Sequence, residues 1–354
     1  MAANGANDMK RTYRLAEVAK PGALDIAERE TPSPGAGEVL IAVEACGVCG
    51  ADAADIARAD PALRPPRVPG HEVVGRIAAL GAGTPSIWRM GQRVGVGRLG
   101  GHCNACVQCR RGEFQLCLKQ PVVGSSCDGG YAEMMIARAT ALVSIPDELS
   151  SEEAAPLLCA GIATFNALKK SGAEAGDTVV VQGIGGLGHL ALQYARKMGF
   201  RVVAVGRGAD IADDALGLGA HVYIDSKAED PVARLRGLGG ATAIVTTIGD
   251  GQAVAALIGA LVPQGRLVLL GAGKDPLPVS AGHLVGGERN VLGSMTGTPF
   301  ENERTLDFSV LAGVRPRIET MPLRRAAEAV ARMKSGEARF RLVLTMTEAR
   351  DAHQ

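Results

Sequence analysis

The chain has 354 residues, 47% of them hydrophobic, and this length predicts about two domains at ~150 residues per domain. Its 38 basic and 37 acidic side chains nearly cancel, so charge gives no reason to expect nucleic acid or an anionic membrane as a partner. We find no apolar stretch of the ~18 residues that a membrane span needs, and residues 1–8 lack the apolar core of a secretory signal. These features predict a cytoplasmic protein, in which eight cysteines favour metal ligation over disulfides.

The predicted secondary structure changes near residue 176. Up to about residue 156 the chain reads as β-rich, with short apolar runs separated by Gly and Pro. Beyond residue 176, predicted strands alternate with helical segments, and this alternation predicts a parallel sheet with helices on both faces. The predicted strands of this region are 178–182, 201–205, 221–224, 243–247 and 266–270.

Four cysteines stand close together in a polar, Arg-rich segment. Cys103, Cys106, Cys109 and Cys117 form a C-x2-C-x2-C-x7-C pattern. Four thiolates at such spacings can close a tetrahedral shell around a structural zinc ion. They can equally hold an iron–sulfur cluster, so the spacing alone leaves both interpretations open.

A glycine-rich turn joins the strand at 178–182 to a predicted helix. The turn reads Gly183-Ile184-Gly185-Gly186-Leu187-Gly188. In the strand–turn–helix context of a dinucleotide site, the first glycine permits the tight turn and the second lets the backbone approach a pyrophosphate. The third lets helix and strand pack closely, and the helix N-terminus adds partial positive charge. We therefore predict a dinucleotide-binding site here.

The residues at the end of the second strand should determine whether the site prefers NAD or NADP. NAD sites place a carboxylate there, which binds the ribose 2′-hydroxyl. This chain has Gly206 and Arg207 instead, and an arginine suits the 2′-phosphate of NADP. The sequence thus favours NADP over NAD.

Six motifs follow one another along the chain. They are Gly47-Val48-Cys49, Gly70-His71-Glu72, the four-cysteine segment, Asp128-Gly129-Gly130-Tyr131-Ala132-Glu133, Cys159-Ala160-Gly161 and Gly183-Ile184-Gly185-Gly186-Leu187-Gly188-His189. In this order they resemble the zinc-containing medium-chain alcohol dehydrogenases from about residue 10 to about residue 345. The resemblance implies an α/β protein in which a β-rich GroES-like catalytic domain (1–158 and 297–354) carries an inserted Rossmann dinucleotide-binding domain (159–296).

The resemblance also implies a role for each motif residue. Cys49, His71 and Cys159 would hold a catalytic zinc whose fourth position stays open for Lewis-acid chemistry. Asp52 would orient His71. Glu72 would pair with Arg341 or ligate the zinc transiently, and Arg341 is also a candidate cofactor-binding residue. The four clustered cysteines would bind a structural zinc, giving two zinc ions per chain and making the iron–sulfur interpretation less favoured.

Two positions depart from the family's usual pattern. Family members usually carry Ser or Thr two residues after the first ligand cysteine, where this chain has Ala51. They usually carry Thr four residues after the third ligand, where this chain has Ala163 with Thr164 beside it. The missing hydroxyls remove the usual proton relay to solvent.

We therefore carry three functional hypotheses. The main one is hydride transfer between NADP(H) or NAD(H) and a small alcohol, aldehyde or ketone. The alternatives are NADPH-dependent reduction of conjugated C=C bonds, which needs no such relay, and a non-catalytic zinc-binding relative. The resemblance also implies a homodimer or a homotetramer.

Overall fold

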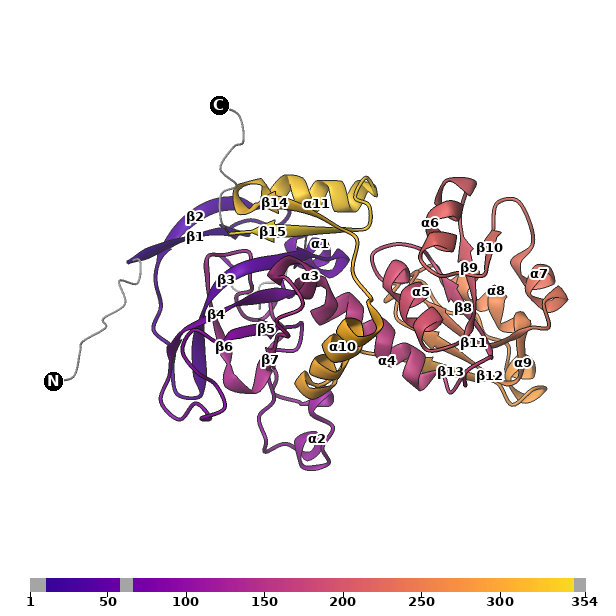
Figure 1. Ribbon diagram of the computed structural model, residues 1–354, viewed down its shortest axis with the longest axis horizontal. Helices are drawn as coiled ribbons and strands as arrows, with labels where there is room; N and C mark the ends of the chain where they lie inside the picture. The colour runs from indigo at the N-terminus through magenta and orange to yellow at the C-terminus, as the bar shows by residue number, and fades with distance from the viewer. Residues whose placement is uncertain (1–10, 58–65, 347–354) are drawn as a thin grey trace. The chain divides into compact units, whose positions relative to one another are not determined.

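The computed structural model describes residues 11–57 and 66–346 (Figure 1). It contains two compact units, Met1–Pro156 with Ile318–Gln354, and Leu157–Arg317. The N-terminal segment 1–8, to which the expectation about a secretory signal refers, lies outside the described residues. Within the described ranges, no helix combines the length and the apolar character that crossing a membrane requires.

One long strand organises the first unit. One edge of β3 (Glu38–Val48) pairs with β4 (Val73–Leu80), and the other edge pairs with β6 (Met134–Arg138) and then with β15 (Arg341–Thr345), all antiparallel. Buried apolar side chains of these strands form the core of this unit. The other strands described here are β1 (Thr12–Glu17), β2 (Asp25–Glu30), β5 (Arg93–Val96), β7 (Leu142–Ser144) and β14 (Ile318–Pro322).

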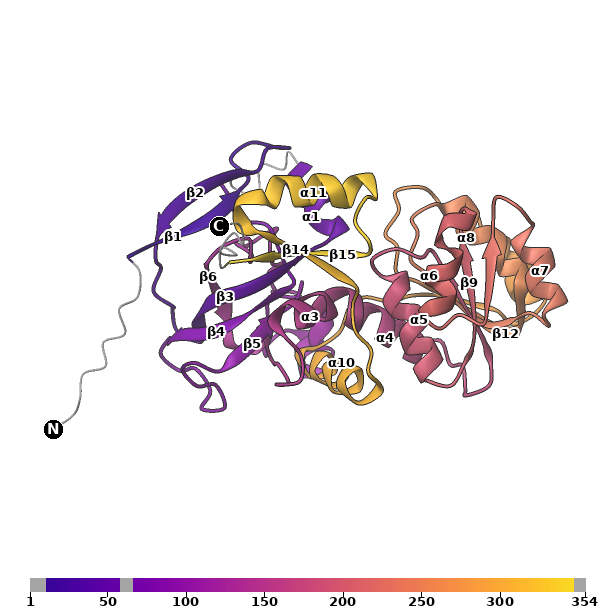
Figure 2. The same cartoon turned by 45° about the horizontal axis from the view of Figure 1, so that its top comes forward.

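The C-terminal segment of the first unit is a strand–helix–strand crossover. β14 and β15 are parallel neighbours, and α11 (Ala326–Ser335) connects them and lies beside α1 (Gly50–Ala57) (Figure 2). This crossover brings β15, far along the chain, next to the end of β3. The remaining helical segments described in this unit are α2 (Val107–Arg110), η2 (Phe114–Leu116), η3 (Ala139–Ala141), α3 (Ser151–Pro156) and η7 (Leu323–Arg325).

The second unit is built on a six-stranded parallel sheet, which confirms the predicted Rossmann architecture. In chain order its strands are β8 (Thr178–Gln182), β9 (Arg201–Gly206), β10 (Val222–Asp225), β11 (Ala241–Thr246), β12 (Leu261–Leu269) and β13 (Asn290–Gly293). They lie in the order β10-β9-β8-β11-β12-β13, the doubly wound order that reverses between β8 and β11. Val179, Val180 and Val181 are fully buried, as expected for a strand covered on both faces.

Helices of the second unit flank this sheet (Figure 1). α5 (Gly188–Lys197) begins inside the glycine-rich turn and buries Leu190, Tyr194 and Ala195 completely. The other helical segments described here are η4 (Leu157–Gly161), α4 (Ile162–Lys170), η5 (Ala209–Ile211), α6 (Ala212–Gly217), α7 (Pro231–Gly237), α8 (Gly251–Ala256), η6 (Leu257–Ala260), α9 (Ala281–Val285) and α10 (Pro299–Ala312).

The boundary near the C-terminal side differs from the predicted domain limits. We expected residues 297–354 to belong to the catalytic domain, but the structure assigns α10 to the second unit and starts the returning segment at Ile318. Asn302 Nδ2 donates to the Leu158 carbonyl at 3.3 Å, and the Ser309 hydroxyl lies 2.7 Å from that of Tyr194. Sequence pattern predicts a helix but not the partner against which it packs.

Candidate active site and cofactor site

The end of β3 and the start of β4 bring three potential ligands together. Cys49 follows β3, while His71 and Glu72 precede β4. Because Cys46 pairs with Val73 across the two strands, the segments that carry the ligands lie side by side. All three residues are buried, and their ligand atoms lie within 4.8 Å of one another. The first unit thus brings together Cys49 and His71, which lie more than twenty residues apart in the sequence.

A buried carboxylate fixes the His71 ring. Asp52 Oδ1 lies 2.7 Å from His71 Nδ1, so in a neutral ring Nδ1–H donates to it. Asp52 Oδ2 accepts from the Cys49 amide at 2.8 Å and from the Tyr131 hydroxyl at 3.0 Å. The other ring nitrogen, His71 Nε2, is buried with no hydrogen-bond partner among the described residues. A ring held this way presents its free lone pair to a metal ion.

The electrostatics of this group call for a cation. Burial alone would lower the pKa of His71, but Asp52 and Cys49 outweigh burial and raise it to about 10. Burial raises the pKa of Glu72 to about 7 against the opposing effect of Arg341. The rise at His71 reflects the negative charge of Asp52 and Cys49, which a metal ion at this place would also balance. Thiolate and imidazole donors fit zinc better than the oxygen-seeking Mg²⁺ or Ca²⁺.

Glu72 pairs with Arg341, as one of the two predicted roles requires. Arg341 begins β15, next to the end of β3, and its Nη2 lies 2.5 Å from Glu72 Oε1. The side chains of Arg341 and Glu72 are only 4% and 0% exposed. This buried pairing in the first unit favours the structural role of Arg341 over the alternative role in binding the cofactor.

A second charged pair near His71 was not predicted. Asp55 is buried on α1 and forms an ion pair with Arg98, whose Nη1 lies 3.4 Å from His71 Nδ1. Arg67 donates to the Asp55 carbonyl. Asp55 stands three residues after Asp52, so helical spacing could have placed both carboxylates on one face. Arg98 carries no such signal, because its neighbours come from other segments of the chain.

Cys159 lies in the π-helical turn η4 at the start of the second unit, and it is partly exposed. Pro156, which lacks an N–H, stands immediately before this turn, and π-turns within helices are frequent at functional sites. The nearby Thr164 hydroxyl is fully buried and donates within its own helix to the Ala160 carbonyl at 2.7 Å. Thr164 therefore does not replace the hydroxyl that is absent at Ala163.

The four clustered cysteines form a compact sulfur cage. Cys106 Sγ lies 3.5 Å from Cys109 Sγ and 3.9 Å from Cys117 Sγ, and Cys103 Sγ lies 4.0 Å from Cys109 Sγ. A tetrahedral zinc with ~2.3 Å bonds places its sulfurs ~3.8 Å apart. An iron–sulfur cluster spreads its thiolates over different iron atoms and needs wider separations. The geometry therefore fits a single ion.

The pKa values of the cage thiols also bear on metal binding. Backbone N–H groups, led by that of Cys109, lower the pKa of Cys106 to about 6. Burial and the neighbouring thiols raise the pKa of Cys109 to about 11. A cation among the four sulfurs would favour the thiolate form of all of them.

Three glycines of the turn after β8 differ in backbone geometry and in the space around them. Gly183 adopts a φ of +90°, which side-chain-bearing residues rarely adopt. A Cβ at Gly185 would meet no atom within 4 Å, so the backbone is open to a ligand there. A Cβ at Gly188 would lie 1.9 Å from the Gly183 carbonyl oxygen, so only glycine allows α5 to start this close to β8.

A cavity of about 750 Å³ opens beside this turn, in the size range of small-molecule sites. Four of the predicted cofactor residues line it: Gly183, Ile184, Gly206 and Arg207. The predicted Gly185, Gly186, Leu187 and Gly188 lie in the adjoining turn and the first turn of α5. The second unit thus gathers the strand end and the turn around one cavity.

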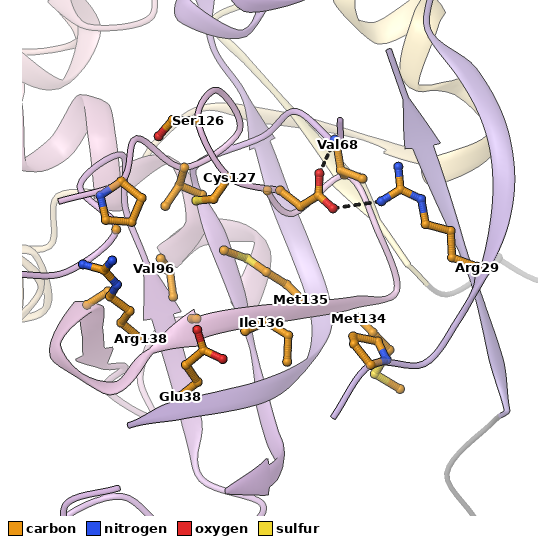
Figure 3. Close-up of a pocket in the computed structure, with 18 of the residues that line it drawn as sticks. Arg29, Glu38, Val68, Val96, Ser126, Cys127, Met134, Met135, Ile136 and Arg138 are labelled. Carbon is orange, nitrogen blue, oxygen red and sulfur yellow. Dashed lines mark hydrogen bonds and ion pairs between the residues drawn. The ribbon is translucent and has the colours of Figure 1, made fainter. Parts of the chain in front are cut away.

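A second cavity, of about 570 Å³, lies in the first unit (Figure 3). Val68, Val96 and Met135 contribute apolar lining, and Arg29 pairs with Asp128 at one end at 2.8 Å. Burial raises the pKa of the lining Cys127 to about 11, so this thiol is protonated near neutral pH. Among the described lining residues, none belongs to the predicted site.

The fold combines a β-rich unit that carries potential metal ligands with a Rossmann-type unit that carries a glycine turn beside a cavity. The sequence matches the family described as "Alcohol dehydrogenase GroES-like domain" over residues 35–147. Residues 186–310 match "Zinc-binding dehydrogenase". "Alcohol dehydrogenase patD" of Penicillium expansum is 42% identical over 343 residues, covering 96% of this chain and 100% of the relative. The chain belongs to the medium-chain alcohol dehydrogenase family, and it is an oxidoreductase of that family.

Solved structures share the same fold. A protein described as CAD from Helicobacter pylori, complexed with NADP(H), is 27% identical with a TM-score of 0.82, covering 96% of this chain and 100% of the other. An acetophenone reductase from Geotrichum candidum, in complex with NAD, is 26% identical with a TM-score of 0.83, covering 95% and 98%. These similar structures hold different dinucleotides, so similarity does not choose the cofactor.

Proposed function

We propose that this protein is a zinc-dependent oxidoreductase that interconverts alcohols with aldehydes or ketones, using NADP(H) in preference to NAD(H). The observation that carries the proposal is the buried Cys49–His71 group, in which Asp52 orients His71 and the Nε2 atom has no hydrogen-bond partner within residues 11–57 and 66–346. Cys159 would complete the ligand set of two thiolates and one imidazole that leaves a fourth position open.

A zinc ion at this place would supply Lewis acidity toward an alcohol or carbonyl oxygen. Residues of the protein orient the potential ligands and balance the charge around them. Asp52 holds the His71 ring through Nδ1, and Tyr131 and the Cys49 amide hold Asp52. Arg341 neutralises Glu72 beside the ligands. In the second unit, the turn at Gly183–Gly188 would receive the pyrophosphate of the dinucleotide at the N-terminus of α5.

We also propose a second zinc ion, bound by the four clustered cysteines in a purely structural role. The three sulfur–sulfur distances of 3.5, 3.9 and 4.0 Å support it. A closed four-thiolate shell leaves no position for substrate, so this ion would stabilise its segment and take no part in turnover. We further propose a cytoplasmic homodimer or homotetramer acting on a small molecule.

Hydride transfer can be tested on the zinc-loaded protein. We would follow NADPH oxidation with a panel of aldehydes, ketones and conjugated enones, and identify the products. Alcohol products from saturated carbonyl compounds support the proposal. Saturated ketones from enones, without carbonyl reduction, favour the C=C reductase. Absence of turnover with any substrate, in protein that binds zinc, favours the non-catalytic relative.

Arg207 should discriminate between the two cofactors. Its side chain is exposed and lines the cavity beside the glycine turn. A charge-assisted bond to the 2′-phosphate is worth ~1.5–3 kcal/mol, which corresponds to roughly 10- to 150-fold in affinity. We expect Arg207→Ala to raise the NADPH KM by at least ~10-fold and the NADH KM far less, as steady-state kinetics will show.

Two further substitutions make this test specific. Arg234→Ala removes an exposed arginine on α7 that does not line the cavity, so it should leave both KM values unchanged. Asp210 does line the cavity. If Asp210→Ala raises the NADH KM while Arg207→Ala changes both cofactors equally, an acidic residue selects NAD and the NADP proposal is wrong.

Ala51 should limit alcohol oxidation at neutral pH. Ala51 lies on α1 between Cys49 and Asp52 and has no hydroxyl to pass a proton. Asp52 cannot easily take its place, because its two oxygens already accept hydrogen bonds from His71, the Cys49 amide and Tyr131. General acid–base assistance is typically worth ~10²–10⁴-fold. We expect oxidation that accelerates as pH rises, and Ala51→Ser should increase the rate near pH 7 by at least ~10-fold without changing the cofactor KM.

The matched control is Ala54→Ser, which adds the same hydroxyl to an exposed position of the same helix. It should leave the pH–rate profile unchanged. A deuterated alcohol shows whether hydride transfer limits the rate. If it does, and Ala51→Ser is no faster than the unmodified protein, protons already leave efficiently by another route.

A further inference from the structure

Gly206 ends β9 in a space that another side chain already fills. A Cβ built on Gly206 would lie 2.5 Å from Tyr223 Oη and 2.7 Å from Tyr223 Cε2. Real Cβ atoms essentially never come within 3.0 Å of a neighbour. The tip of the Tyr223 ring, which comes from β10, therefore lies where a side chain at residue 206 would begin.

The same tyrosine holds the turn that follows. Tyr223 Oη donates to the Gly208 carbonyl at 2.5 Å, and the Gly208 amide donates to Asp225 Oδ1 at 2.7 Å. The Ser226 hydroxyl donates to the Gly206 carbonyl at 2.8 Å. Residues on both sides of Arg207 are thus tied to the end of β10, while the Arg207 side chain stays exposed at the cavity.

β9 and β10 supply this arrangement through their register. They are parallel neighbours, and Asp225 pairs with Gly206 across them. The carboxyl ends of both strands therefore meet at the edge of the sheet where doubly wound folds bind their ligands. A side chain on β10 can therefore limit, by its size, which side chains fit at the end of β9.

We propose that Tyr223 is a positioning residue for cofactor specificity. It occupies the place of the carboxylate that would bind a ribose 2′-hydroxyl, and it fixes the Gly208 side of the turn that presents Arg207 to a 2′-phosphate. This inference rests on the proposed preference for NADPH. Its consequence is that residues 206 and 223 must change together before the site can accept NADH well.

The test is a double-mutant cycle with Gly206→Asp and Tyr223→Ala, singly and combined, in zinc-loaded protein. Fluorescence titration gives the Kd of NADPH and NADH for each variant. Gly206→Asp alone should weaken both cofactors by at least ~10-fold, because the new side chain displaces the Tyr223 ring. Adding Tyr223→Ala should restore NADH binding by at least ~10-fold while NADPH stays weak. Tyr223→Phe, which keeps the ring, should restore nothing.

A gain of NADH affinity by Gly206→Asp with Tyr223 in place, or additive effects of the two substitutions, would overturn the inference. If the aspartate variants do not fold, Gly206→Ala carries the same test, since its Cβ alone meets the ring. It should lower the melting temperature when Tyr223 is present and leave it unchanged beside Tyr223→Ala. Equal or tighter NADH binding by the unmodified protein would refute the NADP proposal, and the specificity role of Tyr223 with it. A clear NADPH preference without coupling between residues 206 and 223 would refute only the role of Tyr223.

Discussion

Replacing Cys103 with alanine should lower the melting temperature by roughly 10 °C or more, because it opens the sulfur cage and releases its zinc. Cys103 Sγ lies 4.0 Å from Cys109 Sγ and accepts from the Cys106 amide at 3.4 Å. The segment around the cage contains only the short helices α2 and η2. Without the ion, few other interactions hold this segment in place, so thermal unfolding should begin there.

Turnover per folded molecule should change less than about threefold in this variant, since a closed structural site does not touch substrate. Cys127→Ala is the matched control, because Cys127 is also partly exposed and stands outside both ligand groups. It should retain both zinc ions and change the melting temperature by only a few degrees. If Cys103→Ala is as stable as Cys127→Ala, the four cysteines do not form a structural zinc site.

Replacing His71 with alanine should reduce turnover by at least ~10³-fold while the dinucleotide still binds. His71 is fully buried, and the Asp52 carboxylate orients its ring. Its removal takes a ligand from the proposed catalytic metal and leaves Asp52 without its main partner. The glycine turn belongs to the other unit, so the Kd of NADPH should stay within about threefold by fluorescence titration.

Tyr131→Phe provides a graded comparison for this effect. It keeps the ring and removes only the hydroxyl that donates to Asp52 at 3.0 Å. Loss of a partner that orients a metal ligand typically costs ~10- to 100-fold in activity or metal affinity. Turnover by His71→Ala near the unmodified rate would remove the zinc mechanism, whatever Tyr131→Phe does.

Much of the second unit could be predicted from the sequence, because its signals are local. The apolar run at 178–182, the glycine turn and the helical stripe after it follow one another without interruption, and they became β8, the turn and α5. β13 (Asn290–Gly293) was not predicted, since it is four residues long and only partly buried. The assignment of α10 depends on packing partners that a local pattern does not contain.

The candidate sites also differ in how far the sequence alone could predict them. The four-cysteine cage is visible in the sequence because its ligands lie within fifteen residues of one another. Cys49 and His71 meet only through the pairing of β3 with β4, so resemblance to a family, not spacing, suggested them. Arg98 beside His71 and Tyr223 beside Gly206 could not be predicted, since each depends on contacts between separate segments.

The most direct test of the account is to measure zinc per chain and carbonyl reduction on the same samples during stepwise chelation. We predict two zinc ions per chain in the fully loaded protein. The first should leave readily because its site is open, activity should fall in proportion to it, and adding zinc back should restore turnover. The second should leave only as the protein unfolds. Full activity in protein that has lost the first ion, or only one zinc in fully active protein, would contradict the account.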